Sequence, residues 1–221
     1  MPAILFGSIS TIADTSELQR ESFNAAFREH GLDWNWSREV YVPLLESNGG
    51  AQRVVDYARA QGQDVDAAAV HRTKSELFQR TVVRSGAQAR PGVVETIKAA
   101  KAEGVKVALV TTTPRENIIA LLDGVDDLSA EDFDLITDLS TVEASKPDPA
   151  VYAFALDDLG EDPAATVAIE DNVGGMQSAQ AAGIRTIAFP NQNTAGQDFG
   201  PADERVERLD AERVRSRIAA S

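Results

Sequence analysis

The chain has 221 residues, of which 43% are hydrophobic and 25% are charged, a balance typical of a globular protein with a buried core. Its 35 acidic residues outnumber its 21 basic residues, and the net charge of −14 argues against binding to a nucleic-acid backbone. The lack of cysteine excludes disulfides, thiol catalysis and cysteine-bound metals. No apolar run is long enough to span a membrane and no signal-peptide pattern is present, so we expect a cytoplasmic protein.

The N-terminal part of the chain contains one strand pattern followed by a long helical segment. Residues 3–6 (AILF) predict a buried strand, and the small hydroxyl-bearing residues after them predict a loop that wraps an anion. From residue 16 to about residue 88, apolar residues recur at three- and four-residue spacing and no strand pattern occurs. We therefore predict an all-helical cap over residues 16–88.

From residue 91 onward, helical and strand patterns alternate. The apolar run 105–110 (VKVALV) is typical of a strand that is buried on both faces of a parallel sheet. Further strands are predicted at 133–137, 166–170 and 184–189, with helical segments between them. This alternation predicts an α/β fold, a doubly wound, Rossmann-like parallel sheet formed by residues 1–15 and 89–221, with the all-helical cap inserted after its first strand.

Candidate functional residues follow the predicted strands, because ligands of open α/β sheets bind at the carboxyl ends of the strands. Thr111 and Thr112 follow the second strand, Lys146 precedes a proline, and Glu170 and Asp171 end the fourth strand. Each has an ordinary alternative: hydroxyls and acids often cap helices, and a lysine before a proline is usually solvated. Gathered at one sheet edge, however, these groups would bind phosphate and a divalent metal.

The order of these groups resembles motifs two to four of the haloacid dehalogenase (HAD) superfamily, mostly Mg²⁺-dependent phosphatases with a helical cap after strand one. The stretches RESFNAAFREHGLDWNW, RPGVVETIKAAKAEGVKVALVTTT and SKPDPAVYAFAL are similar to the CbbY-like sugar-bisphosphate phosphatases. The best-known activity of that branch is removal of a phosphate from xylulose-1,5-bisphosphate. The resemblance covers nearly the whole chain.

The resemblance implies roles for the residues after the strands. Thr111 matches the hydroxyl that hydrogen-bonds the transferring phosphoryl group, with the backbone of Thr112 beside it. Lys146 matches the lysine that neutralises the charge of phosphate and nucleophile. Glu170 and Asp171 match the acids that hold Mg²⁺.

The first motif departs from the superfamily pattern. Relatives carry Asp-x-Asp-Gly-Thr-Leu at the end of strand one, where the first aspartate attacks phosphorus and the second is the general acid/base. In LFGSISTIADT, Gly7 stands at the nucleophile, Ile9 at the acid/base and Ser10 at the glycine, while Thr11 follows the pattern. An aspartyl-phosphate cannot form on glycine, and isoleucine cannot protonate a leaving group. The usual reaction is therefore expected to be absent.

The metal and substrate ends of the site depart from the pattern as well. The metal would keep only Glu170 and Asp171, so we expect weak Mg²⁺ binding at most and no other cofactor. In the cap, Arg53 matches an arginine that faces the substrate, but residues 49–53 lack the lysine and glutamate of the relatives. Gln19 stands where close relatives carry histidine. These differences put recognition of the relatives' sugar bisphosphate in question.

The sequence therefore predicts a protein that binds a phosphorylated small molecule of the sugar-phosphate type, with phosphatase turnover lost or strongly impaired. It predicts no nucleic-acid or membrane partner, and it sets no oligomeric state. One alternative is an active phosphatase or phosphotransferase that works without aspartate, through Ser8 or Ser10. Another is a structural or partner-binding protein with a relic pocket. The predicted phosphate and substrate contacts are Ser8, Ser10, Thr11, Thr111, Thr112, Lys146 and Arg53.

Overall fold

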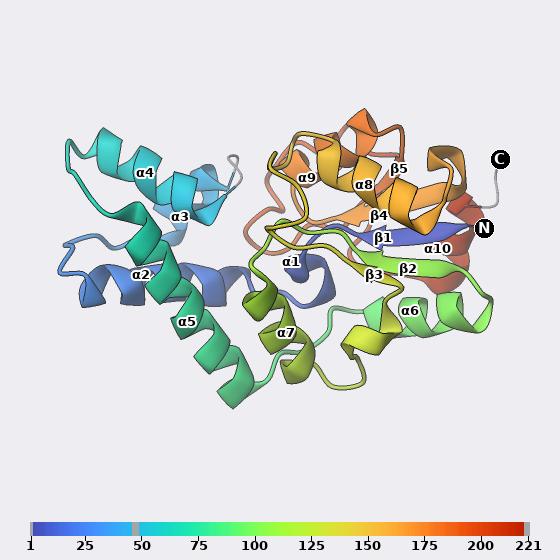
Figure 1. Ribbon diagram of the computed structural model, residues 1–221, viewed down its shortest axis with the longest axis horizontal. Helices are drawn as coiled ribbons and strands as arrows, with labels where there is room; N and C mark the ends of the chain where they lie inside the picture. The colour runs from blue at the N-terminus through green and yellow to red at the C-terminus, as the bar shows by residue number, and fades with distance from the viewer. Residues whose placement is uncertain (1, 46–48, 219–221) are drawn as a thin grey trace.

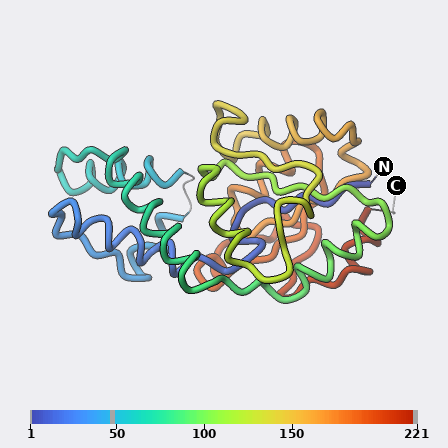
Figure 2. The backbone as a smooth tube through the Cα atoms, turned by 60° about the horizontal axis from the view of Figure 1, so that its bottom comes forward, coloured from blue at the N-terminus to red at the C-terminus, as the bar shows by residue number. Residues whose placement is uncertain are grey.

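The molecule consists of an α/β core and a group of helices beside it, which extend to one side of the core (Figure 1). The computed structural model describes residues 2–45 and 49–218. Within these ranges no helix has the length and apolar character needed to cross a membrane. Strand β1 (Ala3–Phe6) begins, and helix α10 (Ala211–Ile218) lies, at the end of the core that is remote from these helices (Figures 1 and 2).

The core contains a fully parallel sheet in the strand order β3-β2-β1-β4-β5-β6. Strand β1 lies centrally, with Ala3 paired to Lys106 of β2 and to Thr166 of β4. The five predicted strands are present, whereas β6 is only two residues long and has too short a pattern to be recognised in the sequence. The strands are β1 (Ala3–Phe6), β2 (Lys106–Leu109), β3 (Leu135–Ile136), β4 (Thr166–Glu170), β5 (Arg185–Ala188) and β6 (Glu204–Arg205).

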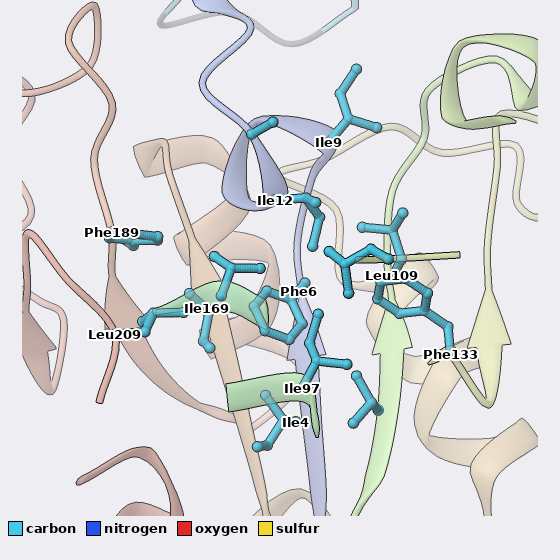
Figure 3. Packing of buried hydrophobic residues seen from close by; sticks show 14 of the residues in the cluster. Ile4, Phe6, Ile9, Ile12, Ile97, Leu109, Phe133, Ile169, Phe189 and Leu209 are labelled. Carbon is cyan, nitrogen blue, oxygen red and sulfur yellow. The ribbon is translucent and has the colours of Figure 1, made fainter. Parts of the chain in front are cut away.

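Helices cover both faces of this sheet, which confirms the predicted doubly wound architecture. Alternate residues of β1 enter different clusters: Ile4 and Phe6 join the larger one (Figure 3), and Ala3 and Leu5 join the smaller one beneath α8. Two short 3₁₀ helices span Ala130–Asp132 and Pro163–Ala165. The core α-helices after the cap are α6 (Val93–Ala102), α7 (Arg115–Gly124), α8 (Ala150–Leu159), α9 (Val173–Ala181) and α10 (Ala211–Ile218).

The segment that follows β1 differs from the loop predicted from the sequence. It forms one helical turn, α1 (Ile9–Ile12), because Ser8 acts as its N-cap. The Ser8 hydroxyl accepts hydrogen bonds from Ser10 N at 3.0 Å and Thr11 N at 3.2 Å. Ile9 and Ile12 are buried in the larger hydrophobic cluster (Figure 3). The prediction of an anion-wrapping loop was therefore wrong: these backbone amides are used in a helix cap.

Four helices fall within the segment predicted to be the cap and share an aromatic core. The ring centroids of Phe27 and Trp36 are 4.7 Å apart, and those of Phe23 and Trp36 are 4.9 Å apart. Such contacts stabilise a small helical unit beyond simple area burial. The helices are α2 (Ser16–Glu29), α3 (Arg38–Leu44), α4 (Gly50–Ala60) and α5 (Ala67–Ser85).

Helix α5 connects the two parts of the molecule. Its N-terminal half packs in the helical unit, where Val70 is buried, while Phe78 and Val82 are buried in the core cluster together with Ile118 and Leu121 of α7. The predicted cap boundary at residue 88 therefore lies beyond the point within α5 where the packing changes from the cap cluster to the core cluster. One continuous helix instead fixes the position of the cap against the sheet edge.

Candidate functional site

A pocket of about 480 Å³ lies between the helical cap and the carboxyl ends of the core strands. Nine of the eleven residues selected from the sequence line it, namely Gly7, Ser8, Ile9, Ser10, Arg53, Thr111, Thr112, Lys146 and Asp171. The other two, Thr11 and Glu170, are fully buried behind the pocket wall. The fold therefore brings residues from five separate stretches of the chain to one cavity.

Gly7 directly follows β1, and the space beside its Cα is filled by neighbouring side chains. A Cβ at residue 7 would overlap the carboxylate of Glu170 and would lie 2.5 Å from Tyr152 Oη. On the other side, a Cβ at Gly175 would overlap the same carboxylate. Glu170 therefore occupies a slot between two glycines, next to the position where a nucleophile's side chain would begin.

Lys146 is the partner of this buried carboxylate. Its ammonium donates to Glu170 Oε1 at 2.7 Å, to the carbonyl of Val110 at 2.8 Å and to the carbonyl of Gly7. An ammonium has three N–H bonds, so these acceptors use all of them. The predicted phosphate contact of Lys146 stays a prediction, and it would require one of these bonds to be broken.

The cluster is closed to solvent. Tyr152 Oη donates to Glu170 Oε1 at 2.7 Å, and the second oxygen of Glu170 is buried with no hydrogen-bond partner among the described residues. Burial, followed by the nearby charge of Asp171, raises the pKa of Glu170, while Lys146 opposes that rise. Burial also raises the pKa of Tyr152 well above its usual value, so its hydroxyl keeps its proton.

Asp171 lies at the pocket wall and accepts hydrogen bonds at both carboxylate oxygens. Ser8 Oγ donates to Oδ1 at 2.7 Å, Asn172 Nδ2 to Oδ1 at 3.1 Å, and Asn191 Nδ2 to Oδ2 at 2.7 Å. Thr194 Oγ1 also donates to the backbone carbonyl of Asp171 at 2.5 Å. The carboxylate is thus fixed in place by neutral donors.

These contacts do not provide a preformed Mg²⁺ site. Mg²⁺ requires near-octahedral oxygen ligands, of which carboxylates supply the charge. Here Glu170 faces Lys146, Asp171 is engaged by side-chain donors, and the described residues contain no group of three His, Cys, Asp or Glu that could hold a metal ion. Weak Mg²⁺ binding at Asp171 stays a prediction, and no chemical step is derived through a metal.

The hydroxyl groups on the core side differ in their availability. Thr111 Oγ1 donates to Thr113 Oγ1 at 2.9 Å and is almost fully buried. Ser10 Oγ lies 3.1 Å from Thr15 Oγ1, and Thr11 Oγ1 donates to the carbonyl of Ser8 at 2.5 Å. Thr11 is therefore used within the α1 cap, whereas Ser10 and Thr112 retain partial exposure in the pocket.

Two cationic side chains line the cap side of the pocket. Arg53 donates through Nε to the carbonyl of Leu44 at 2.7 Å, and its guanidinium lies 5.7 Å from the centroid of the Tyr41 ring. Lys74, on α5, donates to Gln19 Oε1, and its Nζ lies 5.0 Å from the centroid of the Phe23 ring.

Burial controls the ionisation of this cap-side group. Burial, followed by the charge of Arg53, lowers the pKa of Lys74 to about 7. Burial and these two cations likewise lower the pKa of His71 to about 4, so His71 is neutral at pH 7. The pKa values of Lys74 and His71 are thus set by burial and by neighbouring positive charges.

Sequence reasoning missed three residues of this site. Lys74 lies in the segment that is predicted to be helical from its spacing alone, and neither Tyr152 nor Asn191 is among the functional residues predicted from the sequence. Helical spacing could indicate that Tyr152 and Lys74 lie on inward faces, but not what those faces meet. For Asn191, the one available signal is its place just after β5, at the strand edge where ligands bind.

The family follows from comparison with known proteins. The pattern of the haloacid dehalogenase-like hydrolase family matches residues 6–189, which is most of the chain. The chain therefore belongs to the haloacid dehalogenase-like hydrolases, as the resemblance implied, and its sheet order and inserted helices agree with that family.

Within this family, the chain is similar to proteins called CbbY. Protein CbbY of Rhodobacter capsulatus is 38% identical over 215 residues, covering 96% of this chain and 95% of that protein. The crystal structure of CbbY from Rhodobacter sphaeroides in complex with phosphate has a TM-score of 0.87, at 36% identity over 94% of this chain and 95% of that one. A variant of that CbbY in complex with xylulose-(1,5)-bisphosphate has a TM-score of 0.88 with the same identity and coverage. The chain is thus CbbY-like in both sequence and fold.

Proposed function

We propose that this protein binds a phosphorylated small molecule, of the sugar-phosphate type, in the pocket between cap and core and does not hydrolyse it by the family's aspartate chemistry. The CbbY relatives crystallised with phosphate and with xylulose-(1,5)-bisphosphate support this class of ligand. The pocket combines cap-side cations with partly exposed hydroxyls, which suits a phosphate and a polyol.

The observation that carries the proposal is the environment of Gly7. Glycine has no side chain and so supplies no carboxylate, and the space where a side chain would lie is filled by Glu170 and Tyr152. Ile9, at the position of the acid/base, is 2% exposed and is packed in the hydrophobic cluster, where it can transfer no proton. Both chemical functions of the first motif are therefore missing, while the pocket itself persists.

The test is phosphate release from a panel of sugar mono- and bisphosphates with Mg²⁺, measured beside inorganic phosphate binding by calorimetry. We expect phosphate binding without turnover. A triple variant with Gly7→Asp, Ile9→Asp and Ser10→Gly is the matched control, although Glu170 has to leave its slot to admit the new side chain. Family-typical hydrolysis by the unaltered protein would refute the loss of turnover.

A second candidate function, phosphoryl transfer through Ser8, is favoured by one contact. Ser8 Oγ donates to Asp171 Oδ1 at 2.7 Å, so Asp171 is positioned to take the hydroxyl proton as Oγ forms a bond to phosphorus and the ester oxygen leaves. Against it, the same hydroxyl caps α1. A phosphoserine at residue 8, detected by mass spectrometry after incubation with a sugar phosphate, would establish this route. An unmodified Ser8 in a turning-over protein would exclude it.

A further inference from the structure

Lys74 and Lys146 both line the pocket, but their surroundings are opposite. The ammonium of Lys146 donates to the Glu170 carboxylate at 2.7 Å and to the backbone carbonyls of Val110 and Gly7. A lysine that is held as an ammonium has no lone pair on its nitrogen, so it cannot attack a carbon atom. Lys146 is therefore a structural cation rather than a nucleophile.

Lys74 meets no carboxylate in the described part of the chain. It is 4% exposed and donates to the Gln19 amide oxygen, and its Nζ lies 5.0 Å from the Phe23 ring centroid and 5.3 Å from that of Phe78. The rings attract a cation weakly, whereas removal from water disfavours the charged form more strongly. Burial, followed by the charge of Arg53, lowers the pKa of Lys74 to about 7.

The amine form of Lys74 is therefore abundant at neutral pH. With this pKa about half of the molecules carry a neutral amine at pH 7, against roughly one in 2500 for a fully solvated lysine. His71, one helical turn earlier on α5, also lines the pocket and is neutral at pH 7, because burial lowers its pKa to about 4. An unprotonated lysine in an apolar pocket is a nucleophile that forms Schiff bases with carbonyl compounds.

We propose that Lys74 captures the carbonyl carbon of an open-chain sugar phosphate as a Schiff base. This inference rests on the proposed function, because it takes a sugar phosphate as the ligand and adds a covalent bond to it. The open-chain form of a sugar carries the aldehyde or ketone that this reaction needs. The lone pair of Nζ forms a bond to the carbonyl carbon, both hydrogens of the amine leave with the carbonyl oxygen as water, and a C=N bond remains. Water reverses the reaction, so the ligand is held with its phosphate ester intact and is released unchanged.

Reductive trapping with sodium cyanoborohydride at pH 7.5 tests this reaction. Hydride from the reagent converts the C=N bond to a stable secondary amine, which peptide mass spectrometry locates in the chain. The probe is dihydroxyacetone phosphate, whose ketone cannot close into a ring, and glycerol 3-phosphate is the matched control without a carbonyl. We expect an adduct at Lys74 at least about tenfold faster than at the exposed Lys98, because Lys74 is largely unprotonated at this pH. Equal rates at the two lysines would overturn the inference.

A variant that keeps Lys74 tests its environment. Gln19→Glu places a carboxylate where the amide oxygen accepts from Lys74, which favours the ammonium form. We expect the trapping rate at Lys74 to fall at least about tenfold, with no change at Lys98. Gln52→Glu adds the same charge at another residue that lines the pocket, where Gln52 bonds Asp56, and should have little effect. An unchanged rate in Gln19→Glu would contradict the role of the free amine.

Binding without covalent capture is measured separately, by titration calorimetry with glycerol 3-phosphate and with inorganic phosphate. If these bind while dihydroxyacetone phosphate gives no adduct at Lys74, the Schiff base is excluded and the proposed function stands. If none of the three probes binds and no adduct forms, both the inference and the proposed function are overturned.

Discussion

On the core side of the pocket, each charged group has a partner within the protein: Lys146 pairs with Glu170, and Asp171 accepts hydrogen bonds from Ser8 and Asn191. On the cap side, Lys74 has a neutral amide and aromatic rings as neighbours. The charged groups named on the core side are therefore satisfied within the protein, whereas Lys74 has no carboxylate partner among the described residues. Removing a charged side chain should therefore destabilise the protein more on the core side than on the cap side.

The largest expected effect comes from removing one partner of the buried ion pair on the core side. Lys146→Met should lower the free energy of unfolding by about 3–5 kcal/mol, because Glu170 is left charged and buried without a cation. The double variant Lys146→Met with Glu170→Gln should recover most of that loss. Urea denaturation at pH 7 measures both changes. Equal destabilisation by the single and the double variant would show that the ion pair is not what holds the cluster.

Filling the slot beside β1 should have the next largest effect. Gly7→Ala forces Glu170 and Tyr152 to move and should lower the free energy of unfolding by about 1–3 kcal/mol. Gly196→Ala is the control, because a Cβ there meets no atom within 4 Å and should change stability by less than about 0.5 kcal/mol. Similar losses at both glycines would contradict the packed slot.

The buried Lys74 on the cap side should make the stability of the protein depend on pH. In the unfolded chain Lys74 has its usual pKa of 10.5, and burial lowers its folded pKa to about 7. Between these values the unfolded state binds more protons, so stability should rise with pH relative to Lys74→Met, by up to about 1.4 kcal/mol per pH unit. Below pH 7 the difference should be constant. His71 also faces Lys74 and stays neutral over this range, because burial lowers its pKa to about 4.

Urea denaturation of both proteins from pH 6 to 10 measures this slope. A flat difference above pH 7 would show that Lys74 is better solvated or paired than the structure indicates.

The smallest expected effect distinguishes the two serines. Ser8→Ala removes the α1 cap and the hydrogen bond to Asp171, and should lower the free energy of unfolding by about 0.5–2 kcal/mol. Ser10→Ala removes one contact with Thr15 and should cost less than about 0.5 kcal/mol. Thermal unfolding of both variants is sufficient. A larger loss of stability for Ser10→Ala than for Ser8→Ala would contradict the structural role assigned to Ser8.

Much of the fold could be predicted because local patterns define it. The apolar run 105–110 predicts a buried strand without any knowledge of contacts, and the structure contains β2 there. Strand β6 and the turn α1 could not be predicted, since two-residue strands and single helical turns depend on their neighbours more than on their own sequence.

The sequence indicated which residues would lie near the pocket, but not which of their side chains would contact one another. Strand ends converge at one edge of a parallel sheet, so Thr111, Lys146 and Asp171 were found from their order alone. Which charge meets which cannot be deduced in that way. Lys146 and Glu170 are 24 residues apart, and their 2.7 Å contact depends on the glycine slot and on Tyr152.

The sequence by itself determined the α/β alternation, the helical insertion and the presence of Gly7 and Ile9, which carry no carboxylate, because each follows from residue type and spacing. The tertiary structure alone decided that Glu170 fills the space beside Gly7, that Lys146 pairs with Glu170, and that Lys74 lines the pocket with Gln19 as its hydrogen-bond partner among the described residues. The physical reason is that ionic partners are set by three-dimensional proximity and burial, which a linear pattern does not contain.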